Sequence, residues 1–177
     1  MEEIEVPTEH LHEHIHEAAH HAPDTWILTV ALSSALLAVF AAIASLLAGH
    51  HANEAMLEQL KAADQWAYYQ AKGIKSSILE TRSSVLEALG KPVDTKLAAK
   101  LEDYKKEQAE IKEKAEELEK SGTAHLSHHN ILAKSVTLFQ IGIALSAISV
   151  LTRRKWLFWG SLALGASGLY FLVAGLI

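Results

Sequence analysis

An uncharged, apolar run of 23 residues, Trp26 to Ala48, constrains the fold of this chain more than any other feature of its sequence. At about 1.5 Å of rise per residue, a helix of that length covers the ~30 Å hydrocarbon core of a bilayer with some tilt. A helix that is apolar on all faces over this length is not typical of the core of a soluble protein. We therefore predict a membrane-spanning helix over residues 24–49.

Two further uncharged runs, Ser135–Leu151 and Trp156–Ile177, follow in the last third of the sequence. They predict membrane spans at 131–152 and 155–177, which must be antiparallel neighbours because the turn between them is very short. Helices in lipid associate through faces of small side chains. The small residues that predict these faces are Ser34, Ala38, Ala42, Ser45 and Gly49 in the first span, Gly142 and Ser146 in the second, and Ser161, Gly165, Gly168 and Gly175 in the third.

The charged middle of the chain, residues 50–130, predicts a helical hairpin outside the membrane. Its arms are 50–89 and 94–130, separated by a helix stop at Gly90-Lys91-Pro92. Gly122 is expected to mark a break before the second span. Apolar or small residues at three- and four-residue spacing mark both arms. They are Met56, Leu60, Ala63, Ala67, Ile74, Ile78 and Val85 in the first arm, and Leu97, Leu101, Tyr104, Gln108, Ile111, Ala115 and Leu118 in the second.

The fold class that follows is all-α: three transmembrane helices with an extramembrane antiparallel coiled-coil hairpin, after an acidic, His-rich segment at 1–23. Two helices alone bury little apolar surface, so we expect several copies to associate as a homo-oligomer. The 21 acidic and 16 basic residues form no basic patch, which argues against nucleic-acid binding. The absence of cysteine excludes disulfides and thiolate metal sites.

All eleven histidines lie close to the predicted membrane boundaries. On a helix, His12, His16 and His20 stack at i,i+4 spacing, which can place imidazoles on one divalent ion. The zinc-protease motif His-Glu-x-x-His also occurs twice here, with Glu13 or Glu17 as the base. A stretch so rich in His and Glu produces that match by composition, and no substrate cleft can be built beside it. The alternative is a pH-sensitive amphipathic helix on the membrane surface or between subunits.

A second histidine cluster is expected where the first span ends and the second begins, because antiparallel spans bring those positions to one membrane level. Its members are His50, His51, Glu54, His125, His128 and His129. Nitrogen and carboxylate ligands of this kind can bind a divalent metal such as zinc, nickel or copper. The alternative is that these histidines form hydrogen bonds with lipid headgroups or with the neighbouring helix.

The stretch Leu32–Lys75, with its segments GHHANEA and QWAYYQAK, closely resembles a bacterial family of unknown function, DUF4337. The acidic opening and the tail after Lys155 are similar too. The resemblance implies a small bacterial membrane protein with a helical spacer between hydrophobic ends, and it brings no activity, substrate or catalytic residue. The residues that belong to the two quoted segments are His50, His51, Asn53, Glu54, Gln65, Trp66, Tyr68, Tyr69 and Gln70.

The short turn Arg153-Arg154-Lys155 between the second and third spans carries three basic residues in a row. Short loops rich in arginine and lysine stay in the cytoplasm, so this turn is expected there. With the bacterial origin that the resemblance implies, this predicts a multi-pass protein of the inner (cytoplasmic) membrane. The N-terminus would then lie in the cytoplasm and the hairpin in the periplasm.

The function expected from these features is non-enzymatic: a self-associating membrane scaffold whose hairpin contacts a protein partner or another copy. Membrane lipid is its expected environment, and no cofactor is expected. The alternative function is binding or sensing of a divalent metal through the histidines. A pore formed by several copies also stays open, because Ser and Gln could line one. Trp66, Tyr68 and Tyr69 would pack either between subunits or over the seam of their own arm.

Overall fold

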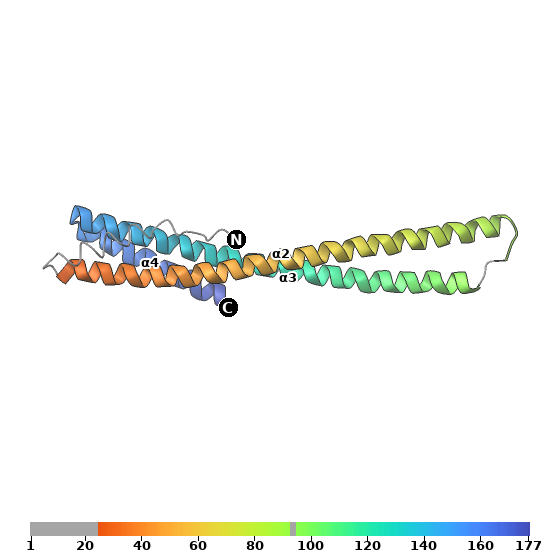
Figure 1. Ribbon diagram of the computed structural model, residues 1–177, viewed down its shortest axis with the longest axis horizontal. Coiled ribbons are helices and arrows are strands. Elements are labelled where there is room, and N and C mark those ends of the chain that lie inside the picture. Colours follow the sequence, from red (N-terminus) through yellow and green to blue (C-terminus); the bar gives the residue numbers. More distant parts are fainter. Residues whose placement is uncertain (1–24, 93–94) are drawn as a thin grey trace. The chain divides into compact units, whose positions relative to one another are not determined.

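The computed structural model describes residues 25–92 and 95–177, and this part of the chain folds into three α-helices without any strand. In chain order they are α2 (Thr25–Ala88), α3 (Thr95–Thr152) and α4 (Lys155–Leu176) (Figure 1). Each of the three contains a stretch that is long and apolar enough to cross a membrane. These observations confirm the all-helical class and the three apolar helices, while the predicted segment 1–23 lies outside the described residues.

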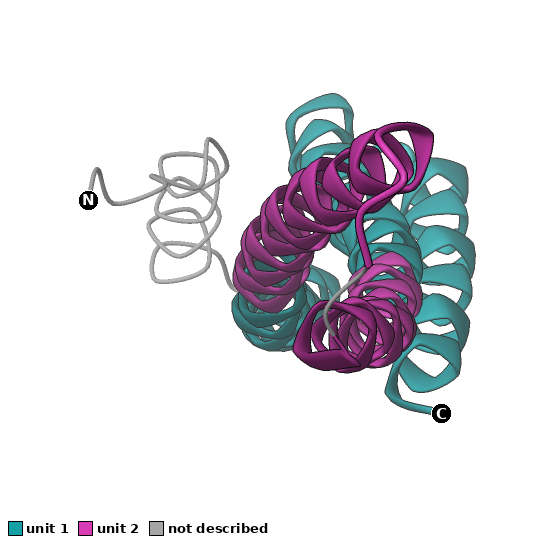
Figure 2. Cartoon of the chain, turned by 90° about the vertical axis from the view of Figure 1, so that its right-hand side faces the viewer, with its two compact units in different colours: residues 1–52, 126–177 teal, residues 53–125 magenta. Residues whose placement is uncertain are grey.

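The chain divides into two compact units (Figure 2). Unit 1 comprises residues 1–52 and 126–177, and unit 2 comprises residues 53–125. In unit 1 the described part consists of the first half of α2, the second half of α3 and all of α4. In unit 2 the remaining halves of α2 and α3 pack against each other.

Helix α2 ends at the predicted stop through a Schellman motif. Gly90 has a φ angle of +64°, and the N–H of Lys91 donates to the carbonyl of Leu86 at 2.9 Å. Helix α3 ends in the same way, with the N–H of Arg154 donating to the carbonyl of Ser149 at 3.2 Å. Here the left-handed position is occupied by Arg153, with a φ of +52°. A side chain at such a position costs about 1–2 kcal/mol relative to glycine.

The interior of unit 1 combines a few large apolar side chains, among them Leu132, Phe139 and Ile143, with many small and polar residues. On α4 the predicted face is confirmed, since Ser161, Gly165, Gly168 and Gly175 are all buried. Ser135 Oγ donates to the carbonyl of Gly168 at 2.8 Å, so this serine joins α3 to α4. The predicted face on α2 was partly wrong. The small residues that α2 buries in unit 1 are Ala31, Ser34, Ala41, Ala44 and Ala48, whereas Ala42 is exposed.

Large apolar side chains also cover the outside of unit 1. Leu32 is 72% exposed, and Leu46 is 76% exposed. The same class of residue lines the outer side of the whole unit: Leu28, Leu36, Val39, Ile43, Ile148, Leu151, Trp156, Trp159, Leu169, Tyr170 and Val173. A surface of this kind is not what a water-soluble bundle presents, because its apolar side chains would be expected inside.

In unit 2 the two helices run in opposite directions. Contacts between them pair Trp66 with Glu119 and Glu80 with Lys105, so the residue numbers fall on α3 as they rise on α2. On the α2 side of this seam the small residues Ala55, Ala62 and Ser76 are buried. On the α3 side, Ile111 and Ala115 are buried.

Two expectations for the middle of the chain were wrong. Gly122 does not break a helix, because α3 continues through it. It is instead buried against α2, where a Cβ would lie 3.3 Å from the side-chain nitrogen of Gln59 and 3.4 Å from the carbonyl oxygen of Ala55. The apolar stripe predicted from Met56 to Val85 also does not face α3. The buried residues of α2 at the seam are alanine and serine, and the side chains of the predicted stripe lie on the exposed side of α2.

Candidate functional site

Two neighbouring histidines of α3 join the helices of unit 1. Nδ1–H of His129 donates to the carbonyl of Ala48 on α2 at 2.9 Å. Nδ1–H of His128 donates to the carbonyl of Gly175 on α4 at 3.0 Å. Both rings are half-buried. The predicted alternative, in which these histidines bind the neighbouring helix, therefore describes the contacts that these two side chains make.

The histidines of α2 contribute ring contacts to the same cluster. The ring of His51 stacks on that of His128 with 5.1 Å between centroids, and His50 lies 5.6 Å from His51. Glu54 and His125, which were expected to complete the site, belong to unit 2. Within the described ranges, no group of three or more His, Cys, Asp or Glu residues could hold a metal ion.

The N-terminal triad of His12, His16 and His20 lies outside the described residues, so the predicted metal site stays a prediction. The hydrogen bonds of His128 and His129 show which ring nitrogen of these two histidines is left to accept. Because a carbonyl oxygen only accepts, Nδ1 is the donor nitrogen of each ring, and Nε2 is the acceptor nitrogen of the neutral form. Metal-binding histidines are usually oriented in this manner by a backbone carbonyl.

A second cluster, in unit 2, surrounds Lys72. Its ammonium group forms an ion pair with Glu107 of α3 and lies 4.8 Å from the centre of the Tyr104 ring and 5.4 Å from that of Tyr68. The Lys72 side chain is only 11% exposed. The hydrogen bond to Glu107 raises the pKa of Lys72 above its ordinary value of 10.5, against a smaller opposing effect of burial. Neither the apolar spacing nor the histidine pattern pointed to this lysine.

The aromatic residues of QWAYYQAK divide between the seam and the surface. Trp66 Nε1–H donates to Glu119 at 2.8 Å, and its ring meets that of Tyr69 edge-on at 5.6 Å. Gln108 donates to the backbone carbonyl of Tyr69 at 3.3 Å. Tyr68 is 49% exposed. Trp66 and Tyr69 thus cover the seam of their own chain, which is one of the two roles considered for them.

The arrangement of these groups is structural in character: carbonyl-bound histidines in unit 1, and a charged and aromatic seam in unit 2. A family model described as a domain of unknown function, DUF4337, matches residues 26–177. The chain belongs to the DUF4337 family. This confirms the resemblance seen in the sequence for residues 26–177. Searches of curated proteins and of solved structures found no match.

Proposed function

We propose that this DUF4337 protein is a membrane-anchored, self-associating helical scaffold without enzymatic activity. The observation that carries the proposal is the distribution of side chains in unit 1. Buried serines, glycines and alanines lie inside together with a few large side chains such as Phe139 and Leu132, while many leucines, valines and tryptophans lie on the outside. Helices packed through small residues and coated with large apolar ones are suited to lipid. The three apolar helices supply the spans.

Unit 2 fits the part of such a scaffold that stands in water. In residues 95–125, α3 carries fifteen charged side chains, and its apolar positions face α2. We infer that this unit is an antiparallel coiled-coil hairpin. The basic turn at Arg153-Arg154-Lys155 favours a cytoplasmic position for that turn. The N-terminus would then be cytoplasmic and the hairpin periplasmic, in the inner membrane of a bacterium.

The test is the mass of the protein in its native membrane environment. Membranes would be washed with alkaline carbonate, and the retained protein would be extracted into nanodiscs for native mass measurement. We expect the protein to stay with the membrane and to form a defined oligomer. Release by carbonate would contradict the membrane anchor, and a monomer at all concentrations would contradict self-association.

Binding of a divalent metal is the second candidate function, and the ring orientation of His128 and His129 favours it. The sharpest variant is His129→Asn with His128→Asn, because the asparagine amide can replace Nδ1–H toward the carbonyls but offers nothing in place of Nε2. Protein purified without a metal column would be analysed for zinc, nickel and copper. A stoichiometric metal that is lost in the variant would support this function. Metal-free wild-type protein that takes up none on addition would rule it out.

A further inference from the structure

The half of α2 that lies in unit 2 leaves its largest apolar side chains on the surface. With Leu89, which directly follows α2, they form a stripe whose members are each more than half exposed: Met56 65%, Leu60 60%, Ile74 63%, Ile78 60%, Val85 52% and Leu89 64%. Exposed alanines at positions 63, 67 and 71 lie between them. With 3.6 residues per turn, all these positions fall on one side of the helix.

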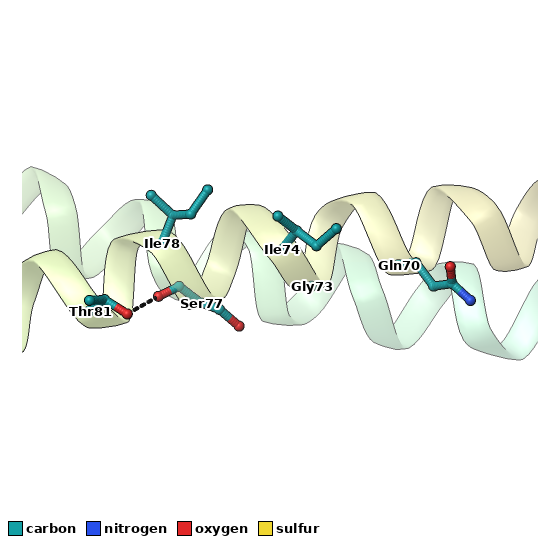
Figure 3. A pocket seen from close by; sticks show the side chains of 6 residues that line it. All are labelled: Gln70, Gly73, Ile74, Ser77, Ile78 and Thr81. Carbon is teal, nitrogen blue, oxygen red and sulfur yellow. Dashed lines mark hydrogen bonds between the residues drawn. The ribbon is translucent and has the colours of Figure 1, made fainter.

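This stripe lies on the side of α2 opposite to the seam with α3. The neighbours Ala62 and Ala63 show the division, since Ala62 is 1% exposed and Ala63 is on the surface. Figure 3 shows Ile74 and Ile78 pointing the same way from successive turns, with Ser77 and Thr81 beside them on the same helix. These four residues, with Gln70 and Gly73, line a shallow groove.

Charge is distributed unevenly around the stripe. No charged residue interrupts it from Met56 to Leu89. On a helical projection, Asp64, Lys75 and Arg82 all flank one edge of the stripe, whereas Gln59, Gln70 and Ser77 flank the other edge. The two edges therefore differ in chemistry, with charges on one side and neutral polar groups on the other.

These features fit a second copy of the same chain. Copies inserted in one membrane share one orientation, so two α2 helices that meet there run parallel; this step rests on the proposed function. In a parallel pair, each edge faces the opposite edge of the partner. The charged edge would therefore meet the neutral one, and no like charges would be opposed. Confinement to one membrane also raises the effective concentration of copies for one another.

The size of the stripe is adequate for this partner. Six aliphatic side chains exposed to this degree offer on the order of 600 Å² per copy, near the roughly 800 Å² that each side of a standard interface buries. The spacing also suits a long contact, because the pattern repeats every eleven residues, as in Ala63, Ile74 and Val85. Such a repeat corresponds to about 3.67 residues per turn, so the apolar stripe stays on one side of a helix that supercoils only gently, with a right-handed sense.

We propose that the exposed stripe of α2, from Met56 to Leu89, is the surface through which two copies of this protein dock in parallel and in register. The chain has no cysteine, so single introduced cysteines can test this directly. In native membranes under mild oxidation, the variants Met56→Cys and Val85→Cys should each form a disulfide-linked dimer. An antiparallel pair would link at most positions near its centre, so both ends linking to themselves requires the parallel register. Ala109→Cys, on the exposed side of α3, is the matched control and should stay monomeric.

A second variant examines the energetics of the same surface. Ile74→Glu with Ile78→Glu places like charges face to face in the parallel dimer, and both side chains are already exposed within one chain. We expect the disulfide at Met56→Cys to be lost in this background while the helical circular dichroism is unchanged. Lys75→Glu, at the edge of the stripe, should preserve the link.

Each of the other results would contradict the proposal, and each would show whether the stripe alone or also the scaffold function is refuted. A defined oligomer without links at either end would refute this surface and leave the scaffold function standing on another face. A wild-type monomer in native membranes would remove both. Equal linking at Ala109→Cys would indicate random collision. Cysteines at the two ends that are protected from a maleimide without forming dimers would show a different occupant, either lipid or another segment of the chain.

Discussion

At the residue scale, glycines that carry no side chain beyond a hydrogen atom determine how closely the helices of unit 1 approach one another. A Cβ at Gly168 would lie 2.9 Å from the ring of Phe139, which is fully buried and cannot move aside freely. A Cβ at Gly160, on the same helix, would meet nothing within 4 Å. These two glycines are therefore a natural pair, one constrained by packing and the other not.

We predict that Gly168→Ala lowers the stability of the protein by about 1–3 kcal/mol, the usual result of adding volume to a filled core. Gly160→Ala should change it little, because the added methyl group enters open space. Thermal unfolding followed by circular dichroism in one detergent would compare the two variants. Equal stability of both would show that α4 does not pack against Phe139.

A second prediction at this scale concerns Lys72. Its pKa is raised in the folded protein, chiefly by the hydrogen bond to Glu107, so the folded state holds this proton more tightly than the unfolded state. The resulting stabilisation is complete below the ordinary value of 10.5 and is lost as the pH rises through the higher value in the folded state. Lys72→Met should therefore lower the melting temperature at neutral pH, and its deficit should shrink as the pH rises above that value. Lys75→Met, on the exposed side, serves as the control for general lysine titration.

At the element scale, the seam of unit 2 depends on small side chains in α2. We predict that Ala62→Leu destabilises the pair of helices by about 1–3 kcal/mol, because a leucine at a 1%-exposed position must push α3 away. Ala63→Leu, one residue further, should cost little within the chain and should strengthen the exposed stripe. Thermal unfolding gives the first effect, and dimer formation gives the second. A larger loss for the Ala63 variant would mean that the helix is rotated from the orientation described.

Sequence reasoning found the elements but not all of their faces. The helix stop at Gly90 and the small face of α4 were predicted correctly, because a glycine cap and a glycine-rich span have few alternative explanations. The seam face of α2 was missed, because spacing identifies an apolar stripe without saying what covers it. In the folded chain the residues of α2 that are buried against α3 are alanine and serine, not the larger residues of the stripe. Lys72 was missed for a related reason, since a lysine in a seam is favoured only once Glu107 and Tyr104 are known to lie opposite.

At the scale of the whole molecule, the apolar runs alone predicted the all-helical class and the three long apolar helices. Chemical detail at the histidines was less accessible, because positions that share a membrane level need not share a site. His51 and His128 meet, and the partners of His128 and His129 are backbone carbonyls. Every residue has a backbone carbonyl, so the sequence does not show which of them accept hydrogen bonds from histidine. These two hydrogen bonds could be found only in the folded chain.

The orientation of the whole molecule gives the last prediction. Short loops rich in arginine and lysine stay in the cytoplasm, and the turn Arg153-Arg154-Lys155 concentrates three such charges. In intact cells, Ser84→Cys in unit 2 should therefore react with a membrane-impermeant maleimide, whereas Thr152→Cys should react only after the membrane is opened. Both side chains are exposed, so differences in labelling report the side of the membrane and not burial. The reverse labelling pattern would place unit 2 in the cytoplasm. The two copies that dock through the stripe of α2 would then meet in a reducing compartment.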